Sequence, residues 1–183
     1  MLTDLQEIIE RVKKGDQAAF RKIVEEYRQQ AFSMAFRILC DEEEARDVVQ
    51  DSFIKIWQKI GTYDMTQKFS TWLYKIVANS AIDRMRQIKR HKMVNLEKAI
   101  SQIDHLNFDD MQTEGDNKET ARLIRWLADG LPEKQKLVFI MRDLEGIDSP
   151  EVRKILNMSE TSVKSNLYHA RIAIREKLLK AIK

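Results

Sequence analysis

Apolar residues recur every three or four positions along most of this chain, which is the spacing of amphipathic helices. Up to residue 92 this spacing predicts four helices, over residues 3–14, 16–39, 41–60 and 70–92. Gly15 and a polar loop from Gly61 to Lys68 interrupt the pattern, and Asp41 with Glu44 has the spacing of a capping box. Four helices of this length are expected to form one compact bundle.

The same spacing returns after residue 116 and predicts shorter helices over 116–129, 132–143 and 150–156, with a last helix from Ser159. Residues 95–115 between the two sets are acidic and only weakly periodic. We therefore expect an all-α chain with two small helical domains, a four-helix bundle (1–94) and a helix-turn-helix domain (116–183). A flexible acidic linker (95–115) would join them.

Composition narrows the possible functions. Gly (5) and Pro (2) are scarce, and the charged residues amount to 33% with a net charge of +3. The single cysteine, Cys40, excludes an internal disulfide and is expected to be a buried thiol. No apolar run approaches the ~20 residues of a membrane span, so we expect a cytoplasmic protein without membrane insertion. With no phosphate loop, nucleophile elbow or metal-ligand spacing, neither an enzyme nor a cofactor is expected.

The helix predicted over 41–60 carries a polar edge beside large apolar residues. Asp47, Gln50, Ile54 and Trp57 follow one another at steps of three or four residues, so they share one flank. This combination suits a protein interface, whereas each apolar residue taken singly is more often part of a core.

The next helix and the loop before it interleave aromatic and cationic residues. Such residues can stack on exposed bases and hold phosphates, although they can equally pack the bundle and neutralise the helix C-terminus. The set comprises Tyr63, Lys68, Phe69, Trp72, Tyr74, Lys75, Asn79, Arg84, Arg86, Lys89 and Arg90.

The last two predicted helices have the pattern of a helix-turn-helix. Ser159 can cap the final helix, and Val163, Leu167, Ala170 and Ile174 form its inward stripe. The opposite face could reach base edges and phosphates in a major groove, or could simply be a solvated surface. That face carries Lys164, Ser165, Asn166, Tyr168, His169 and Arg171.

In this order, these segments resemble bacterial sigma factors of the extracytoplasmic-function (ECF) group. The resemblance rests on GDQAAFRKIVEEY from Gly15, ARDVVQDSFIKIW from Ala45, FSTWLYKIVANSAIDRMRQIKR from Phe69, LPEKQKLVFIMRDLEG from Leu131, and TSVKSNLYHARIAIREKL from Thr161. It covers nearly the whole chain except the linker, and its second and third stretches are the most specific.

The resemblance implies a role for each candidate set. Binding of the β′ clamp of core RNA polymerase falls on Asp47, Val48, Gln50, Asp51, Phe53 and Trp57. Recognition and melting of the −10 element falls on Tyr63, Lys68, Phe69, Trp72, Lys75, Asn79, Arg84, Arg86, Lys89 and Arg90. Recognition of the −35 element falls on Ser162, Lys164, Ser165, Tyr168, His169 and Arg171.

The expected partners are the β′ and β subunits of core RNA polymerase, promoter DNA and an anti-sigma factor. Asn166 and His169 stand where the family commonly carries arginines, so no base preference is predicted for the −35 element. Two alternatives remain from the residues: a helix-turn-helix regulator with an N-terminal sensor or dimerisation bundle, and an adaptor that binds polymerase without DNA.

Overall fold

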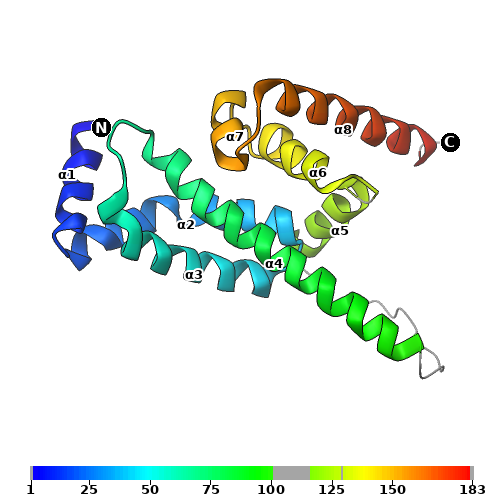
Figure 1. Cartoon of the computed structure of the whole chain (residues 1–183), viewed down its shortest axis with the longest axis horizontal. Helices are drawn as coiled ribbons and strands as arrows, with labels where there is room; N and C mark the ends of the chain where they lie inside the picture. Colours follow the sequence, from blue (N-terminus) through cyan, green and yellow to red (C-terminus); the bar gives the residue numbers. More distant parts are fainter. Residues whose placement is uncertain (1, 101–115, 129, 182–183) are drawn as a thin grey trace.

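The computed structural model describes residues 2–100, 116–128 and 130–181, and every regular element within these ranges is a helix (Figure 1). The N-terminal half contains α1 (Leu2–Lys13), α2 (Gln17–Leu39), α3 (Glu42–Lys59), a 3-10 turn η1 (Ile60–Thr62) and α4 (Phe69–Ile100). The C-terminal half contains α5 (Asp116–Ala128), α6 (Glu133–Phe139), a π turn η2 (Ile140–Leu144), α7 (Ser149–Leu156) and α8 (Glu160–Ala181).

Local capping chemistry sets the helix boundaries of the N-terminal half. Gly15 lies in the turn between α1 and α2 and has a φ of +88°, a left-handed conformation that costs glycine little free energy. Asp16 then caps α2 by accepting a hydrogen bond from the backbone N–H of Ala19 at 3.0 Å. Asp41 caps α3 in the same way through the N–H of Glu44, at 3.1 Å. These boundaries confirm the helices predicted from the sequence.

Helix α4 is longer than the sequence pattern predicts. It continues to Ile100, past the expected end near residue 92 and into the segment assigned to the linker. No Gly or Pro occurs between residues 90 and 100, and Lys, Glu, Leu and Ala favour helix, so the loss of apolar periodicity did not end the helix. The rest of the predicted linker, 101–115, lies outside the described residues.

The C-terminal half is built around the turn between α6 and α7. The single helix predicted over 132–143 widens after Phe139 into the π turn η2, after which Gly146 takes a φ of +66°. Asp148 caps α7, and Asn157 ends it in the left-handed region with a φ of 51°. Helix α8 follows after a short turn, which completes the predicted helix-turn-helix.

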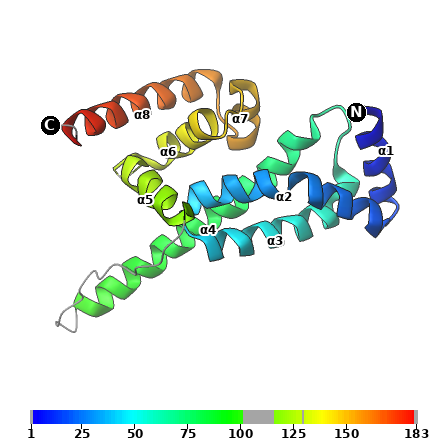
Figure 2. The same ribbon diagram turned by 180° about the vertical axis from the view of Figure 1, so that it is seen from behind.

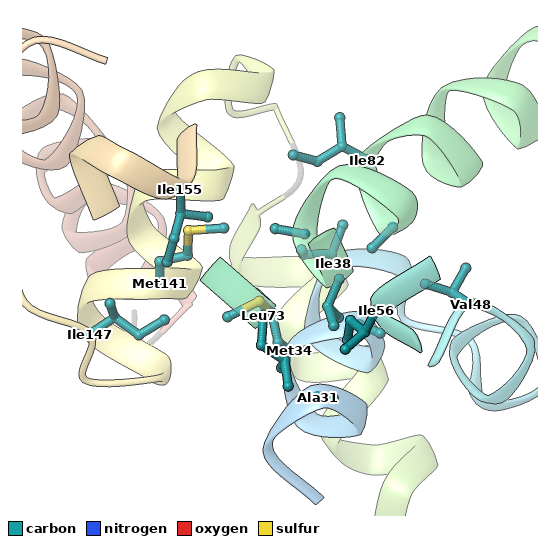
Figure 3. Close-up of a cluster of buried hydrophobic side chains, with 14 of the residues drawn as sticks. Ala31, Met34, Ile38, Val48, Ile56, Leu73, Ile82, Met141, Ile147 and Ile155 are labelled. Atoms are coloured by element: carbon teal, nitrogen blue, oxygen red, sulfur yellow. The ribbon is translucent and has the colours of Figure 1, made fainter. Parts of the chain in front are cut away.

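One apolar core runs through both halves. In Figure 3, Met34 and Leu73 lie between Ile38 and Ile56 on one side and Met141 on the other. The cluster continues through Ile147 and Ile155 under α7, and Figures 1 and 2 show the C-terminal half lying along α2 and the first part of α4. The fold is all-α, as predicted, with its two halves packed against each other. None of the described helices is both long enough and apolar enough to span a membrane.

Candidate nucleic-acid and polymerase surfaces

Helix α8 presents its predicted DNA-binding face to solvent. Ser159 Oγ accepts the N–H of Ser162 at 3.1 Å and fixes the start of the helix, while Val163, Ala170 and Ile174 are buried. Lys164, Ser165, Tyr168 and His169 are exposed, and Tyr168 is 63% accessible. This exposed surface therefore combines hydrogen-bond donors, hydrogen-bond acceptors and one exposed tyrosine ring.

Three members of the predicted −35 set have structural partners. Lys164 pairs with Glu160, one turn earlier on α8, at 2.7 Å. Ser162 is half-buried, and its carbonyl oxygen accepts a hydrogen bond from Asn166 Nδ2 at 2.8 Å. Arg171 forms a bidentate pair with Asp143, at 2.9 and 2.6 Å, which ties α8 to the π turn and raises the pKa of the guanidinium. The pair holds the Nε–H and one Nη2–H of Arg171, and the remaining N–H groups of the guanidinium stay exposed on α8.

The outward face of α4 carries most of the predicted −10 set. Lys75, Lys89 and Arg90 are exposed on the helix and Lys68 just before it, while Asn79 is exposed at the edge that faces the C-terminal half. Arg84 forms a two-pronged pair with Glu44 of α3, one arm at 2.7 Å, and this pair raises the pKa of Arg84. Arg84 therefore links two helices of the bundle.

The aromatic residues of the predicted −10 set lie mainly under the surface. Tyr63 and Phe69 are only 5% and 3% exposed, with ring centroids 5.1 Å apart. Phe69 also meets Tyr27 edge-on at 5.5 Å, and Trp72 packs on Tyr63 at 5.2 Å. In this conformation Tyr63 and Phe69 therefore support the loop from below and are not available for stacking on a base.

The hydroxyl of Tyr63 adds to this support by donating a hydrogen bond to the carbonyl oxygen of Gln67. Burial raises the pKa of Tyr63, so the ring stays neutral at ordinary pH. Trp72, which is half-buried, is the aromatic residue of this group that remains closest to the surface.

Helices α2 and α3 form an apolar groove of about 1000 Å³. Its lining includes Gln50, Phe53 and Trp57 of the predicted polymerase-binding set, and Ile54, which is 50% exposed. Helix α2 contributes Phe20, Val24, Arg28, Gln29 and Phe32. The sequence did not mark these α2 residues as an interface, because Phe20 and Val24 fit the inward stripe of an isolated helix and Arg28, Gln29 and Phe32 lie outside that stripe.

The other three residues of the predicted polymerase-binding set do not line this groove. Asp47 and Asp51 are exposed on α3 outside the groove lining, and Val48 is buried in the bundle core. The structure thus divides one sequence motif into exposed carboxylates, a groove wall and a core residue. Phe53 is itself 7% exposed, so it forms the floor of the groove.

A narrow crevice separates α4 from the C-terminal half. It has a volume of about 340 Å³, and its lining includes Asn79 and Arg86 on one side and Glu133 and Asn157 on the other. Arg86 spans the crevice to Glu133, with Nη2 and Nε at 2.6 and 3.4 Å from its two carboxylate oxygens. This pair raises the pKa of Arg86 and lowers the pKa of Glu133.

Comparison with known proteins assigns both halves to one family. The family description "Sigma-70 region 2" matches residues 23–91, and "Sigma-70, region 4" matches residues 121–174. The first match covers most of the N-terminal bundle. It therefore identifies this bundle as sigma region 2 and not as a sensor or dimerisation domain.

Full-length relatives give the same assignment. The chain is 32% identical to the ECF RNA polymerase sigma factor SigW of Bacillus subtilis, over 93% of this chain and 94% of that protein. It is 29% identical to the ECF RNA polymerase sigma-E factor of Salmonella typhimurium, over 97% and 95%. The family acts in transcription initiation and is not a family of enzymes.

Solved structures share the fold. CnrH, in its complex with the cytosolic domain of CnrY, superimposes with a TM-score of 0.72 at 21% identity, over 98% of this chain and 99% of CnrH. The sigma factor RpoE of Bartonella quintana, in its complex with the anti-sigma factor NepR, gives 0.65 at 21% identity, over 87% and 96%. With region 2 in its first half and region 4 in its second, the chain belongs to the ECF sigma factors of bacterial RNA polymerase.

Proposed function

We propose that this chain binds core RNA polymerase through α2 and α3 and directs it to promoters through α4 and α8. The single observation that carries the proposal is that both halves of an ECF sigma factor are present and each presents a polar face suited to DNA. An apolar groove lies between α2 and α3, and Asp47 and Asp51 are exposed on α3 outside its lining. The protein would act in the cytoplasm, where RNA polymerase works, and would have no catalytic activity of its own.

Each surface has a distinct part in this proposal. Ile54 and Trp57 would anchor a helical element of the β′ subunit, while Asp47 and Asp51 would meet its cations at the rim. Helix α8 would recognise duplex −35 bases, with Lys164, Ser165, Tyr168 and His169 as the exposed candidates.

Helix α4 would hold the opened −10 strand. Lys75, Lys89 and Arg90 would contact its phosphates, and Asn79 would hydrogen-bond an unpaired base. Trp72 is the one aromatic candidate near the surface, and Tyr63 and Phe69 would keep the loop in place beneath it.

An anti-sigma factor is the remaining partner. Among the similar solved structures, CnrH is bound to the cytosolic domain of CnrY, and RpoE is bound to the anti-sigma factor NepR. We propose a regulator of the same kind here, and the groove between α2 and α3 is the described apolar surface that such a partner could cover.

The polymerase surface is tested by reversing one rim charge. Asp51→Lys places a cation where we expect cations of the partner, and like charges brought together in an interface oppose binding. We expect binding to core RNA polymerase of Bacillus subtilis to weaken at least tenfold, about 1.4 kcal/mol, as measured by fluorescence anisotropy of the labelled chain.

The matched control is Glu10→Lys, which makes the same charge change on exposed α1, away from the groove. It should bind as the original chain does, and both variants should keep their helical circular dichroism. Equal affinity of Asp51→Lys and Glu10→Lys would move the polymerase surface away from this edge of α3.

A further inference from the structure

A hollow bordered by α4, α5 and the start of α6 is lined mainly by cations. It has a volume of about 680 Å³, which is in the usual range of pockets that hold small molecules. Among the described residues, its lining contains one carboxylate, that of Glu133. The five cations of the lining are Arg86, Lys89, Arg122, Arg125 and Lys136. The hollow therefore has an excess of positive charge.

The contacts of these cations leave most of that charge in place. Glu133 pairs with Arg86 at 2.6 Å, which accounts for one of the charges. Arg125 donates to a backbone carbonyl oxygen at the end of α2, and a carbonyl accepts a hydrogen bond without bringing a formal charge. Within the described residues, Lys89 and Lys136 form no ion pair.

The cations also lie close enough to act together. The hydrogen bond from Arg86 lowers the pKa of Glu133, and the charge of Lys89 adds to that lowering. Burial raises the pKa of the thiol at the end of α2, while Lys136 and Arg125 both oppose that rise. Lysine and arginine both form charge-assisted hydrogen bonds with phosphate oxygens. Cations from three helices can therefore bind one phosphorylated ligand.

An aromatic ring borders the same hollow. Trp126 lines it together with Met85 and Leu131, and the tryptophan is 36% exposed. Its ring also has Lys177 Nζ at 5.2 Å from the centroid. An accessible indole face stacks on a planar base, which inorganic phosphate does not offer. Cations that suit phosphates beside a stacking surface match the two parts of a nucleotide.

We propose that this hollow binds a nucleoside polyphosphate, with its phosphates on Lys89, Arg125 and Lys136 and its base on Trp126. A nucleotide bound there also competes with the −10 strand, because it occupies Lys89. This competition rests on the proposed role of Lys89 in binding DNA, whereas the nucleotide site itself does not.

The first experiment compares three probes by isothermal titration calorimetry of the full chain at one salt concentration, since salt screens such contacts. ATP carries both parts of the ligand, tripolyphosphate carries the phosphates alone, and adenosine carries the nucleoside alone. ATP should bind most tightly and adenosine most weakly. Equal affinity for ATP and tripolyphosphate overturns the assignment to a nucleotide. An absence of ATP binding at millimolar concentration overturns the site.

Two substitutions then separate the two parts of the site. Lys136→Gln removes a phosphate contact and should weaken the binding of ATP and of tripolyphosphate alike, by about tenfold. Trp126→Leu keeps an apolar side chain and removes the ring. It should weaken ATP binding by about fivefold or more and leave tripolyphosphate binding unchanged. If Trp126→Leu binds ATP as the unchanged chain does, the base does not stack on this ring.

The matched controls are Lys180→Gln and Tyr168→Leu, which make the same kinds of change at exposed positions of α8 outside the hollow. Both should bind ATP with the affinity of the unchanged chain, and all four variants should keep their helical circular dichroism. A loss as large in the controls as in Lys136→Gln and Trp126→Leu would indicate attraction by the whole surface and overturn the site.

Competition with DNA is measured separately. At ten times its own Kd, ATP should weaken the binding of single-stranded DNA by about tenfold. Trp126→Leu removes no cation assigned to DNA, so the same ATP concentration should have a much smaller effect on this variant. If ATP binds with the expected variant pattern and leaves DNA affinity unchanged, the nucleotide site stands and Lys89 is not shared with the −10 strand.

Discussion

The two helices that we propose to face DNA, α4 and α8, differ in how they hold their aromatic and charged residues. On α8, Tyr168 projects into solvent and its polar neighbours are exposed. On α4 and its preceding loop, Tyr63 and Phe69 are buried, while Lys68 and Arg86 pair with the other half of the chain. A helix that binds intact duplex can be preformed, whereas a surface for an opened strand is required only after the polymerase is in place.

The largest expected difference concerns stability. Phe69→Ala removes a ring that packs against Tyr27, Tyr63 and Trp72, and truncation of a buried phenylalanine costs ~3–5 kcal/mol. Tyr168→Ala on α8 should change the free energy of unfolding by less than ~0.5 kcal/mol, because its ring is exposed. Urea unfolding of both variants measures this. Comparable losses would mean that the two aromatic groups play the same structural part.

The next effect concerns sequence preference on α8. The reference duplex is the −35 sequence that the unchanged chain selects from a random library. Lys164→Ala and His169→Ala should each bind it ~1–3 kcal/mol more weakly if the residue contacts a base, and should lose the preference at one base pair. Lys180→Ala, near the far end of the same helix, is the control for loss of one positive charge. Affinities for a set of duplexes with single base-pair changes distinguish base contacts from phosphate contacts. A uniform loss across all duplexes would indicate phosphate contacts alone.

A smaller effect concerns alkaline pH. Burial, together with neighbouring Tyr27, Glu145 and Glu151, raises the pKa of Tyr74 to about 12. Above a pH of about 10 the unfolded chain loses this proton while the folded chain keeps it, so the unfolding free energy falls from about pH 10 to 12. The ring is half-buried, so we expect a contribution of about 1 kcal/mol after solvent screening.

Tyr74→Phe keeps the ring and removes the titrating hydroxyl. Urea unfolding at several values of pH should therefore show a shallower alkaline loss for this variant than for the unchanged chain. Parallel curves for the two proteins would mean that Tyr74 ionises as easily in the folded chain as in the unfolded one.

The smallest expected effect is on salt dependence. Lys89 lies exposed on α4, and its removal should lower the slope of log affinity against log salt for single-stranded DNA by just under one unit, ~0.7. Lys55→Ala, on α3, is the matched control, since Lys55 bonds Ser80 and belongs to no proposed DNA set. An unchanged slope would remove Lys89 from the phosphate contacts.

Most of the fold was predictable from local sequence signals. Asp41 caps α3 as predicted, Asp16 caps α2 through the same local chemistry, Asn157 ends α7, and Cys40 is a buried thiol with 2% exposure. These outcomes depend on a few neighbouring residues and on apolar spacing. The end of α4 was not predictable from periodicity, because helix-favouring residues extend it without an apolar stripe.

The arrangement of the candidate surfaces was less predictable, because it depends on contacts between residues far apart in the chain. An aromatic residue in a polar loop fits both a stacking platform and a buried support, and only the packing of Tyr63 and Phe69 on Tyr27 and Trp72 distinguishes them. Likewise, the sequence around Glu133 and Glu151 contains no signal that these acids pair with Arg86 of α4 and with Lys68 of the loop before it. The α3 wall of the groove was predictable from the sequence, because Gln50, Ile54 and Trp57 share one flank of the helix.

The way α2 ends has a consequence for how this protein can change over time. Cys40 adopts a φ of 55°, and its carbonyl oxygen accepts a hydrogen bond from Arg125 of α5, while Arg37 donates to the carbonyl of Leu144. Both arginines thus bind main-chain atoms, which every amino acid supplies. Mutational drift at residues 40 and 144 can alter the side chain without deleting either acceptor. These two contacts therefore depend only on the two arginines and on the local backbone path. They should tolerate more sequence divergence than the neighbouring ion pair between Arg37 and Glu145, which requires a particular residue at both positions.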